Sequence, residues 1–342
     1  MSALAVGRSL PKGVRVANGR VSIRSVAAAA GVAIGTVSKA LNGDREISEA
    51  TRARVRGVAL ELGYRPMAQA RGLARGRTGN VAVAVRSMFR PVFASAFYSE
   101  VLAGVEAELE RHDLNLLLTS LKRDDDLLRL VSERRADGVL YIGYDLSPDF
   151  LRSLGRQVPL VVVDGEVPGL SSVVSGNGEG ARAATEHLLA RGRRRLVFAA
   201  TTLEQPNFRA RLEAFGNVLR EAGLGPGPTI LGSSFADLCP AFREVLRSYR
   251  PDGVFCANDT LGYTVLQVLE TLHVRVPGEV AVVGYDGTAG SEHRKARLST
   301  LQVDKHDLGA AGVRLFLEHF SDAALPPRQV AVKTVLEPGD TS

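Results

Sequence analysis

Residues 34–39, with the sequence IGTVSK, combine small and hydrogen-bonding side chains with a single cation. Hydroxyl and ammonium groups of this kind can hydrogen-bond to the base edges and phosphates of a nucleic-acid duplex. Ile34 adds an apolar surface and Gly35 has no side chain, so the stretch is slender as well as polar. If these residues share one face of a helix, that helix is suited to the major groove.

Two short helices would have to position this stretch. Residues 23–30 are amphipathic and rich in alanine, and Ser22 is placed to cap their N-terminus. Gly31 supplies the positive φ that ends one helix and turns the chain toward the next, with Val32 as a buried plug. A second helix over residues 33–41 then buries three apolar side chains: Val37, Ala40 and Leu41. This is the layout of a helix-turn-helix.

A third amphipathic helix is predicted from Ser48 onward. Ser48 is its N-cap, and Glu49 lies near the positive end of the helix dipole. Its apolar positions follow the i, i+3, i+4 and i+7 spacing: Val55, Val58, Ala59 and Leu62. Periodicity alone also permits a three-helix bundle with no nucleic-acid role.

The distribution of charge favours the nucleic-acid role. Residues 1–78 contain 14 Lys and Arg against 4 Asp and Glu, whereas the remaining residues contain 29 against 33. The net charge of +6 therefore combines a basic head with a mildly acidic body. Such a head releases counterions when it binds DNA, so its affinity is expected to fall steeply with salt.

The head resembles a known family. VAxxAGVxxxTVSKALNG, ISEATRARV and LGYRP occur in order with their internal spacing intact. Together they are similar to the DNA-binding headpiece of the LacI/GalR family of bacterial transcription regulators.

The resemblance implies roles for single residues of the head. Contacts to phosphates, or fixing of the helix, are implied for Thr36, Ser38 and Asn42. Positions facing the bases are implied for Ile34, Gly35 and Lys39. Lys39 can donate to guanine, and Ile34 can meet a thymine methyl group. Gly35 has no side chain to read with, and Ala33 replaces a hydroxyl-bearing cap, so part of the family pattern is missing.

Residues 64–77, YRPMAQARGLARGR, form a basic linker between head and body. By the same resemblance they become a hinge helix on DNA, in which Leu73 wedges into the minor groove and Ala70 is a small packing residue. Tyr64, where the linker begins, is counted with the DNA-binding residues. Gly72 lies inside this expected hinge helix, where a glycine destabilises the helix by about 1 kcal/mol relative to alanine. A flexible basic tether is the alternative interpretation.

From residue 79 onward, short apolar runs alternate with amphipathic stretches. Buried strands that alternate with helices indicate parallel βαβ units, and the length of this region favours two doubly wound α/β lobes over one. Strands are predicted at residues 81–85, 114–118, 138–142, 160–164, 195–200, 253–257 and 280–286. Helices are predicted at residues 98–112, 180–191, 209–222 and 260–272.

The body is similar to the periplasmic-binding-protein-like effector core of the same family. VVVDGEVPGLSSVV, RARLEAF, ANDTLGYTVLQVL, RVPGEVAVVGYDGT and LSTLQVD match that core in order and spacing. The resemblance implies a type I periplasmic-binding-protein fold in which the chain crosses between the lobes near Ser175, Val303 and Val332. A ligand would lie between the lobes, at the carboxyl ends of the strands.

The sequence is thus expected to divide into four parts. Residues 1–20 would be a disordered arm, residues 21–65 the all-α helix-turn-helix domain and residues 66–78 the hinge. Residues 79–342 would form the effector-binding and dimerisation core. Within it, lobe 1 would comprise residues 79–175 and 303–332, and lobe 2 residues 176–302 and 333–342.

Six residues are carried over to an effector site by resemblance: Phe97, Asp164, Arg211, Asn258, Asp259 and Asp286. A guanidinium fork at Arg211 suits ligand hydroxyls or carboxylates, and Asp286 would accept sugar hydroxyls. Structural alternatives stay open. Arg211 can instead pair with Glu213 or another neighbour, Asp259 can cap the helix that follows it, and Asp164 can simply end its strand.

The loop after the first core strand carries two further cations, Arg86 and Arg90. Near a ligand site they would suit a phosphorylated or acidic molecule. Solvated surface arginines account for them equally well.

The sequence contains no clear motif for a catalytic, cofactor-binding or metal site. GNGEG at residues 176–180 lacks the spacing of a dinucleotide-binding loop, and Asp124–Asp126 are better explained as a helix N-terminus than as a metal site. Cys239 and Cys256 are too few and wrongly spaced for a zinc site or a disulfide framework. We therefore expect no enzymatic activity, no cofactor and no metal.

A ligand-controlled transcription regulator, most simply a repressor, is the leading interpretation. A solute-binding protein of transport type is the alternative, but the basic head and the lack of a signal peptide or membrane span argue against it. The expected partners are double-stranded DNA with a palindromic operator, a sugar-like effector and a second copy of the chain. A homodimer is expected because one head buries too little DNA surface to bind tightly. The expected location is the cytoplasm.

Overall fold

The computed structural model describes residues 21–44, 46–64, 77–85, 95–121, 123, 125–143, 145–288 and 296–342. The chain divides into two compact units, residues 1–78 and residues 79–342. Several predicted features lie outside the described residues: the arm at residues 1–20, Ala70, Gly72 and Leu73 of the linker, Arg86, Arg90 and Asp124.

Three short helices make up the described part of the first unit: α1 (Ile23–Ala30), α2 (Ile34–Leu41) and α3 (Glu49–Glu61). Ser22 caps α1 in a capping box with Ser25, and Gly31 ends that helix with a φ of 65°. Ser48 caps α3. Ala33 precedes α2 without a side-chain cap, since alanine has no acceptor to offer.

The three helices enclose a small core: Val26, Ala27, Ala30, Val37, Ala40, Val55, Ala59 and Leu62. Val32, Leu41 and Val58 pack against it and stay half-buried. The apolar positions predicted from the sequence are therefore the ones that hold the helices together, and the predicted helix-turn-helix is confirmed.

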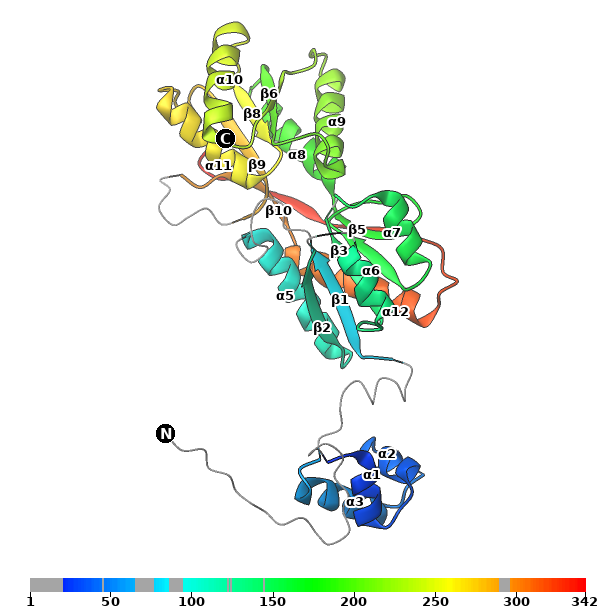
Figure 1. Ribbon diagram of the computed structural model, residues 1–342. Helices are drawn as coiled ribbons and strands as arrows, with labels where there is room; N and C mark the ends of the chain where they lie inside the picture. Colours follow the sequence, from blue (N-terminus) through cyan, green and yellow to red (C-terminus); the bar gives the residue numbers. More distant parts are fainter. Residues whose placement is uncertain are drawn as a thin grey trace, which may run out of the picture. The chain divides into compact units, whose positions relative to one another are not determined.

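Lobe 1 of the second unit is built on a six-stranded sheet with the order β11-β5-β4-β3-β1-β2, in which all neighbours are parallel. Its strands are β1 (Asn80–Val85), β2 (Asn115–Ser120), β3 (Gly138–Ile142), β4 (Leu160–Val163), β5 (Ser171–Ser175) and β11 (Gln329–Val332). Helices α5 (Ala96–Arg111) and α12 (Lys305–Ser321) cover one face, and α6 (Asp125–Ser132) and α7 (Pro148–Gly155) cover the other (Figure 1).

Lobe 2 repeats this plan with the strand order β12-β10-β9-β8-β6-β7. Its strands are β6 (Leu196–Ala200), β7 (Thr229–Leu231), β8 (Gly253–Cys256), β9 (Ala281–Asp286), β10 (Ser299–Val303) and β12 (Thr334–Glu337). Helices α8 (Asn177–Ala190) and α9 (Pro206–Glu221) cover one face, and α10 (Phe235–Ser248) and α11 (Asp259–Thr271) cover the other. Only the pairing of β12 with β10 is antiparallel within this described sheet.

The chain passes between the lobes three times. It leaves lobe 1 after Ser175, returns between Val303 and Lys305, and crosses again at Lys333, between β11 and β12. Because β10 ends and β12 begins at the same boundary between the lobes, the two strands must run in opposite directions. Figure 1 shows the orange and red C-terminal segment taking part in both lobes.

The predicted fold class is confirmed. The seven predicted strands correspond to β1, β2, β3, β4, β6, β8 and β9, and the four predicted helices to α5, α8, α9 and α11. The elements that were not predicted are β5, β7, β10, β11, β12, α6, α7, α10 and α12, and several of them are short, such as β7 with three residues. Among the described residues, no helix is both long and apolar enough to span a bilayer.

Candidate functional site

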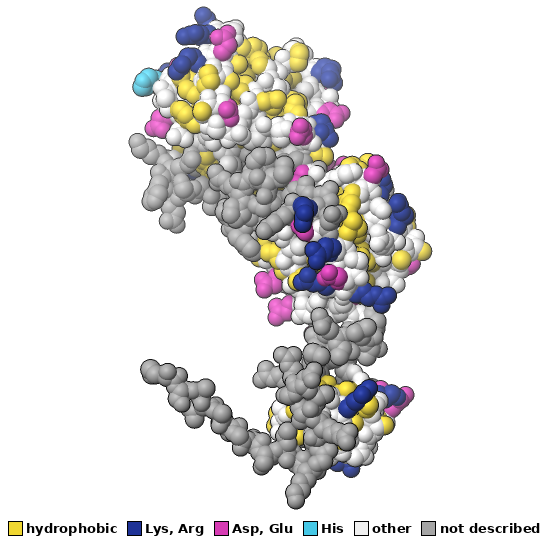
Figure 2. Space-filling view, in the orientation of Figure 1, with side chains coloured by type: hydrophobic (Ala, Val, Ile, Leu, Met, Phe, Trp, Pro, Cys, Tyr) yellow, Lys and Arg dark blue, Asp and Glu magenta, His cyan; other side chains and the backbone are white. Residues whose placement is uncertain are grey.

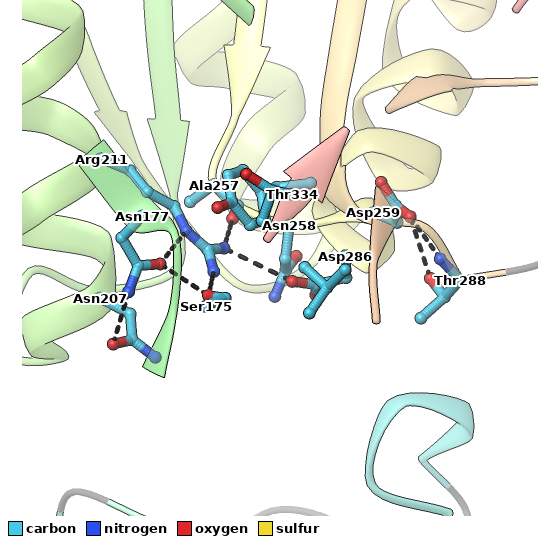
Figure 3. A network of polar contacts seen from close by, with 12 residues as sticks. Ser175, Asn177, Asn207, Arg211, Ala257, Asn258, Asp259, Asp286, Thr288 and Thr334 are labelled. Carbon is cyan, nitrogen blue, oxygen red and sulfur yellow. Dashed lines mark hydrogen bonds and ion pairs between the residues drawn. The ribbon is translucent and has the colours of Figure 1, made fainter. Parts of the chain in front are cut away.

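Polar side chains gather at the carboxyl ends of the lobe 2 strands, next to the first crossing between the lobes (Figure 3). We call this group the polar cluster: Ser175, Asn177, Asn207, Arg211, Asn258 and Asp286. Its members come from segments far apart in the sequence, because parallel strands all end at one edge of their sheet. This edge is where ligands bind in folds of this class.

Arg211 lies at the centre of the polar cluster, and its side chain is only 3% exposed. Its Nε donates to Asn177 Oδ1 at 2.8 Å, its Nη2 donates to Ser175 Oγ at 3.3 Å, and its Nη1 donates to the carbonyl oxygen of Ala257. The guanidinium also lies 3.5 Å from the centroid of the Tyr285 ring. Most of its donors are therefore engaged within the protein.

Asp286 provides a counter-charge for this arginine. Its Oδ1 lies 3.5 Å from Arg211 Nη1, and its side chain is 17% exposed. The sequence left open a pairing of Arg211 with Glu213, but the ion pair joins two residues that were both predicted to bind the effector. Burial raises the pKa of Asp286 well above its ordinary value, and the positive charge of Arg211 opposes that rise.

Asp164 follows β4 in lobe 1 and is hydrogen-bonded to lobe 2. Asn207 Nδ2 donates to Asp164 Oδ1 at 2.9 Å and to the Asp164 carbonyl at 3.1 Å. The Tyr98 hydroxyl, from lobe 1, donates to Asp164 Oδ2 at 3.4 Å. Burial raises the pKa of Asp164 to about 6, against the lowering effect of Arg211. Asp164 therefore does more than end its strand, since it connects the two lobes.

Asn177 and Asn207 complete a continuous chain of contacts and were not predicted. Asn177 Nδ2 donates to Asn207 Oδ1 at 3.1 Å, so the chain runs from Arg211 through both amides to Asp164. A signal for Asn207 exists in the sequence. It lies four residues before Arg211, which puts both side chains on one face of a helix.

Asn258 and Asp259 lie at the start of α11 and have different partners. Asn258, rather than Asp259, caps α11, because its Oδ1 accepts from Leu261 N at 2.9 Å. Asp259 is 1% exposed and accepts from Thr300 Oγ1 at 2.6 Å and from Thr288 N at 2.7 Å. Asp259 thus holds the segment after β9 onto β10, and its contact with the effector stays a prediction.

Phe97 differs from its prediction. Its side chain is buried in the core of lobe 1, where it packs edge-to-face against Tyr98 at 5.3 Å between ring centroids. The neighbouring Tyr98 is the aromatic side chain that reaches Asp164. Helical geometry explains the difference, because adjacent residues at the start of α5 point in different directions.

Lys305 is a further residue that the sequence did not single out. It opens α12, is 1% exposed, and donates from Nζ to the carbonyls of Asp286 and Gly287, each at 3.0 Å. Its Nζ also lies 3.5 Å from Glu100 Oε2 on α5. Lys305 therefore ties the turn that bears Asp286 to lobe 1. No local pattern marks a lysine as buried, so only the fold identifies it.

The head presents its predicted reading residues on α2. Ile34 is 45% exposed, Gly35 and Lys39 are exposed, and Thr36 and Ser38 are half-buried. Asn42 follows the end of α2, and Tyr64 packs against the core of the head. Lys39 is engaged in an ion pair with Glu46 from the loop after α2.

Comparison with known proteins agrees with this architecture. The profile of bacterial regulatory proteins of the lacI family matches residues 22–67, and that of the periplasmic binding protein-like domain matches residues 185–342. The transcriptional regulator CelR of Thermobifida fusca is 31% identical over 334 residues, which cover 93% of this chain and 97% of CelR. The transcriptional repressor PurR of Photobacterium profundum is 30% identical over 315 residues, which cover 88% and 92% of the two chains.

This chain belongs to the LacI family. Solved structures agree. A complex of the regulator CelR with cellobiose superposes with a TM-score of 0.68 at 29% identity, covering 94% of this chain and all of CelR. A lac repressor dimer bound to operator and an anti-inducer gives a TM-score of 0.79 at 23% identity over 94% of this chain and 98% of the repressor chain, a likeness of fold alone.

Family membership settles the class of function. The protein is a DNA-binding transcriptional regulator controlled by a small ligand, and its relatives are regulators rather than enzymes. The alternative of a solute-binding protein of transport type is set aside, because both the head and the core match regulators over nearly their whole length.

Proposed function

We propose that the effector of this repressor is a neutral, polyhydroxylated molecule of the sugar class that binds between the lobes. Arg211, Asp286, Asp164 and Asn258 would contact it directly. The observation that carries this proposal is the balance of charge, since two half-buried carboxylates, Asp164 and Asp286, lie near one arginine. Carboxylates accept hydrogen bonds from ligand hydroxyls but repel an anion.

The partners of Arg211 support the same ligand class. Its Nε, Nη1 and Nη2 all have acceptors within the protein, which leaves little of the fork for a bidentate contact with a ligand carboxylate or phosphate. The CelR structure that resembles this chain holds cellobiose, a neutral sugar. An acidic ligand stays the second candidate only on account of Arg86 and Arg90.

Thermal-shift screening of the full chain separates the two candidates. A bound ligand raises the unfolding midpoint by mass action. We expect midpoint increases with neutral mono- or disaccharides and none with the matching phosphosugars or with purines. A shift with phosphosugars alone would contradict the proposal and assign the binding to the arginines of the loop.

We further propose that the reading surface of the head comprises Ile34, Gly35, Thr36, Ser38, Lys39, Asn42 and Tyr64, with Ala70 and Leu73 from the hinge. A homodimer acting in the cytoplasm would present two such heads to a palindromic operator. Sedimentation is expected to give a dimer mass, and a tetramer mass would contradict this.

Gel shifts on a palindromic duplex at two salt concentrations are expected to show sequence-specific binding that weakens as salt rises.

A further inference from the structure

The loop that follows α2 brings a carboxylate onto the predicted reading surface. Lys39 is the one cation in α2, and its Nζ forms an ion pair with Glu46. Both side chains are accessible, Lys39 at 50% and Glu46 at 72%. The pair raises the pKa of Lys39 chiefly through its hydrogen bond to Glu46.

Contacts within the loop fix the position of Glu46. The backbone N of Asp44 donates to the carbonyl of Lys39 at 3.0 Å, which folds the loop back onto the end of α2. The backbone N of Glu46 donates to Asp44 Oδ1 at 3.0 Å, and Arg52 Nη1 donates to the Asp44 carbonyl at 3.3 Å. These contacts fix the backbone of Glu46 close to the end of α2, and its carboxylate reaches Lys39 from there.

The two kinds of DNA contact open to Lys39 respond differently to this carboxylate. An ammonium group has three donors, so Lys39 can donate to guanine O6 or N7 while it keeps its bond to Glu46. A phosphate would have to approach Lys39 beside a second negative charge, which weakens the attraction. Glu46 therefore weakens a contact of Lys39 with a DNA phosphate more than a contact of Lys39 with a base edge.

We propose that Glu46 is a specificity-determining residue that aims Lys39 at the bases and lowers the affinity of the head for non-cognate DNA. The inference rests on the proposed role of α2 in reading DNA. In this proposal the effect of Glu46 on specificity requires Lys39. A general effect of its negative charge on DNA binding would persist without Lys39.

The test compares four forms of the full chain: wild type, Glu46→Gln, Lys39→Met and the double variant. The probes are a palindromic duplex selected from a random library by the wild-type protein and a scrambled duplex of the same base composition. Dissociation constants are measured by fluorescence anisotropy over a range of salt concentrations. The control is Glu49→Gln, which removes an equally exposed, ion-paired carboxylate of the same head without touching Lys39.

Glu46→Gln is expected to tighten binding to the scrambled duplex about two- to fivefold, the size of an exposed ion pair, with a smaller gain on the selected duplex. The specificity ratio, which is the affinity for the selected duplex divided by the affinity for the scrambled duplex, therefore falls. In the Lys39→Met background the same substitution is expected to leave the ratio unchanged, and Glu49→Gln is expected to leave it unchanged in the wild type.

Two outcomes overturn the inference in different ways. If Glu46→Gln tightens binding to both duplexes equally, or lowers the ratio equally without Lys39, then Glu46 acts only as a general charge. If Lys39→Met alters neither affinity, the proposed reading role of Lys39 fails, and the role of Glu46 fails with it. Both residues are accessible, so matching thermal unfolding of all variants is expected to exclude a folding defect.

Discussion

Arg211 illustrates how a single residue can serve both ligand binding and stability. Its guanidinium is almost fully buried, and its Nη1 lies 3.5 Å from the Asp286 carboxylate. Removing one partner of such a pair leaves the other charge in a medium that solvates it poorly. A substitution here therefore acts on the fold of lobe 2 and on the effector site together.

Arg211→Met is expected to lower the free energy of unfolding by about 3 kcal/mol and to abolish the thermal shift produced by the effector. Urea unfolding and thermal-shift titration measure the two effects. Arg209→Met is the control, because Arg209 lies on the same helix but is exposed and bonds only to backbone carbonyls among its described contacts. An undiminished thermal shift in Arg211→Met would remove Arg211 from the proposed site.

The contribution of Asp259 to the free energy of unfolding is expected to depend on pH with the opposite sign to that of an ordinary paired carboxylate. Burial raises its pKa to about 6, so between about pH 4 and pH 6 the folded chain binds a proton that the unfolded chain has lost. Its contribution to stability is therefore greatest below about pH 4 and decreases as the pH rises through 6.

The comparison of wild type with Asp259→Asn isolates this effect. Relative to the variant, the wild type is expected to lose about 2 to 3 kcal/mol of unfolding free energy between pH 4 and pH 7. Chemical denaturation at a series of pH values measures the difference. A difference that stays constant or grows with pH would show that Asp259 is ionised at its ordinary pKa in the folded protein.

At the level of secondary-structure elements, helices α5 and α12 pack directly against each other on one face of the lobe 1 sheet. The two helices approach so closely that glycine is required on each: a Cβ at Gly104 would lie 1.9 Å from the carbonyl oxygen of His306, and one at Gly309 would lie 2.0 Å from that of Val101. This packing also sets the start of α12, and hence Lys305 beside the turn that bears Asp286.

Gly309→Ala is expected to destabilise the core by more than about 2 kcal/mol, because the added methyl group meets backbone that cannot move aside. Gly216→Ala, in α9, is the matched control, since nothing lies within 4 Å of its added Cβ. There the change is expected to stabilise by up to about 1 kcal/mol through helix propensity. Equal effects of the two substitutions in urea unfolding would contradict the close packing of α5 on α12.

At the scale of the molecule, a ligand bound to the core can change DNA binding only if it favours one arrangement of the chain over another. The face in Figure 2 shows basic and acidic side chains interspersed over both lobes. Specific connections between the lobes include the bonds from Asn207 to Asp164 and from Lys305 to Asp286 and Gly287.

Asn207→Asp would place a second carboxylate against Asp164 and is expected to separate the lobes and weaken effector binding at least tenfold. Hydrogen exchange of residues 160–168 and 205–212 in the full chain is expected to rise. Asn217→Asp, on the same helix, keeps the acceptor for Arg220 and is expected to change neither quantity. Unaltered exchange in Asn207→Asp would mean that this bond does not control how the lobes meet.

Neighbouring residues were sufficient to predict the local elements and the fold class. Amphipathic periods, the turn at Gly31 and the serine caps follow from neighbouring residues, so the head and most strands of the core were predicted from them. The motifs that define the family also lie within continuous stretches, and the predictions of Arg211, Asp286 and Asn258 as effector contacts rest on them.

The tertiary structure decided which side chains meet. Asn177, Asn207 and Lys305 contact the predicted site residues, whereas Phe97 packs in the core of lobe 1 and Asp259 bonds to Thr300, because burial and partners depend on segments separated by tens of residues in the sequence. The ion pair between Lys39 and Glu46 likewise depends on a loop that folds back onto its helix. Periodicity fixes the face on which a side chain lies, but only the packed chain fixes what lies opposite to it.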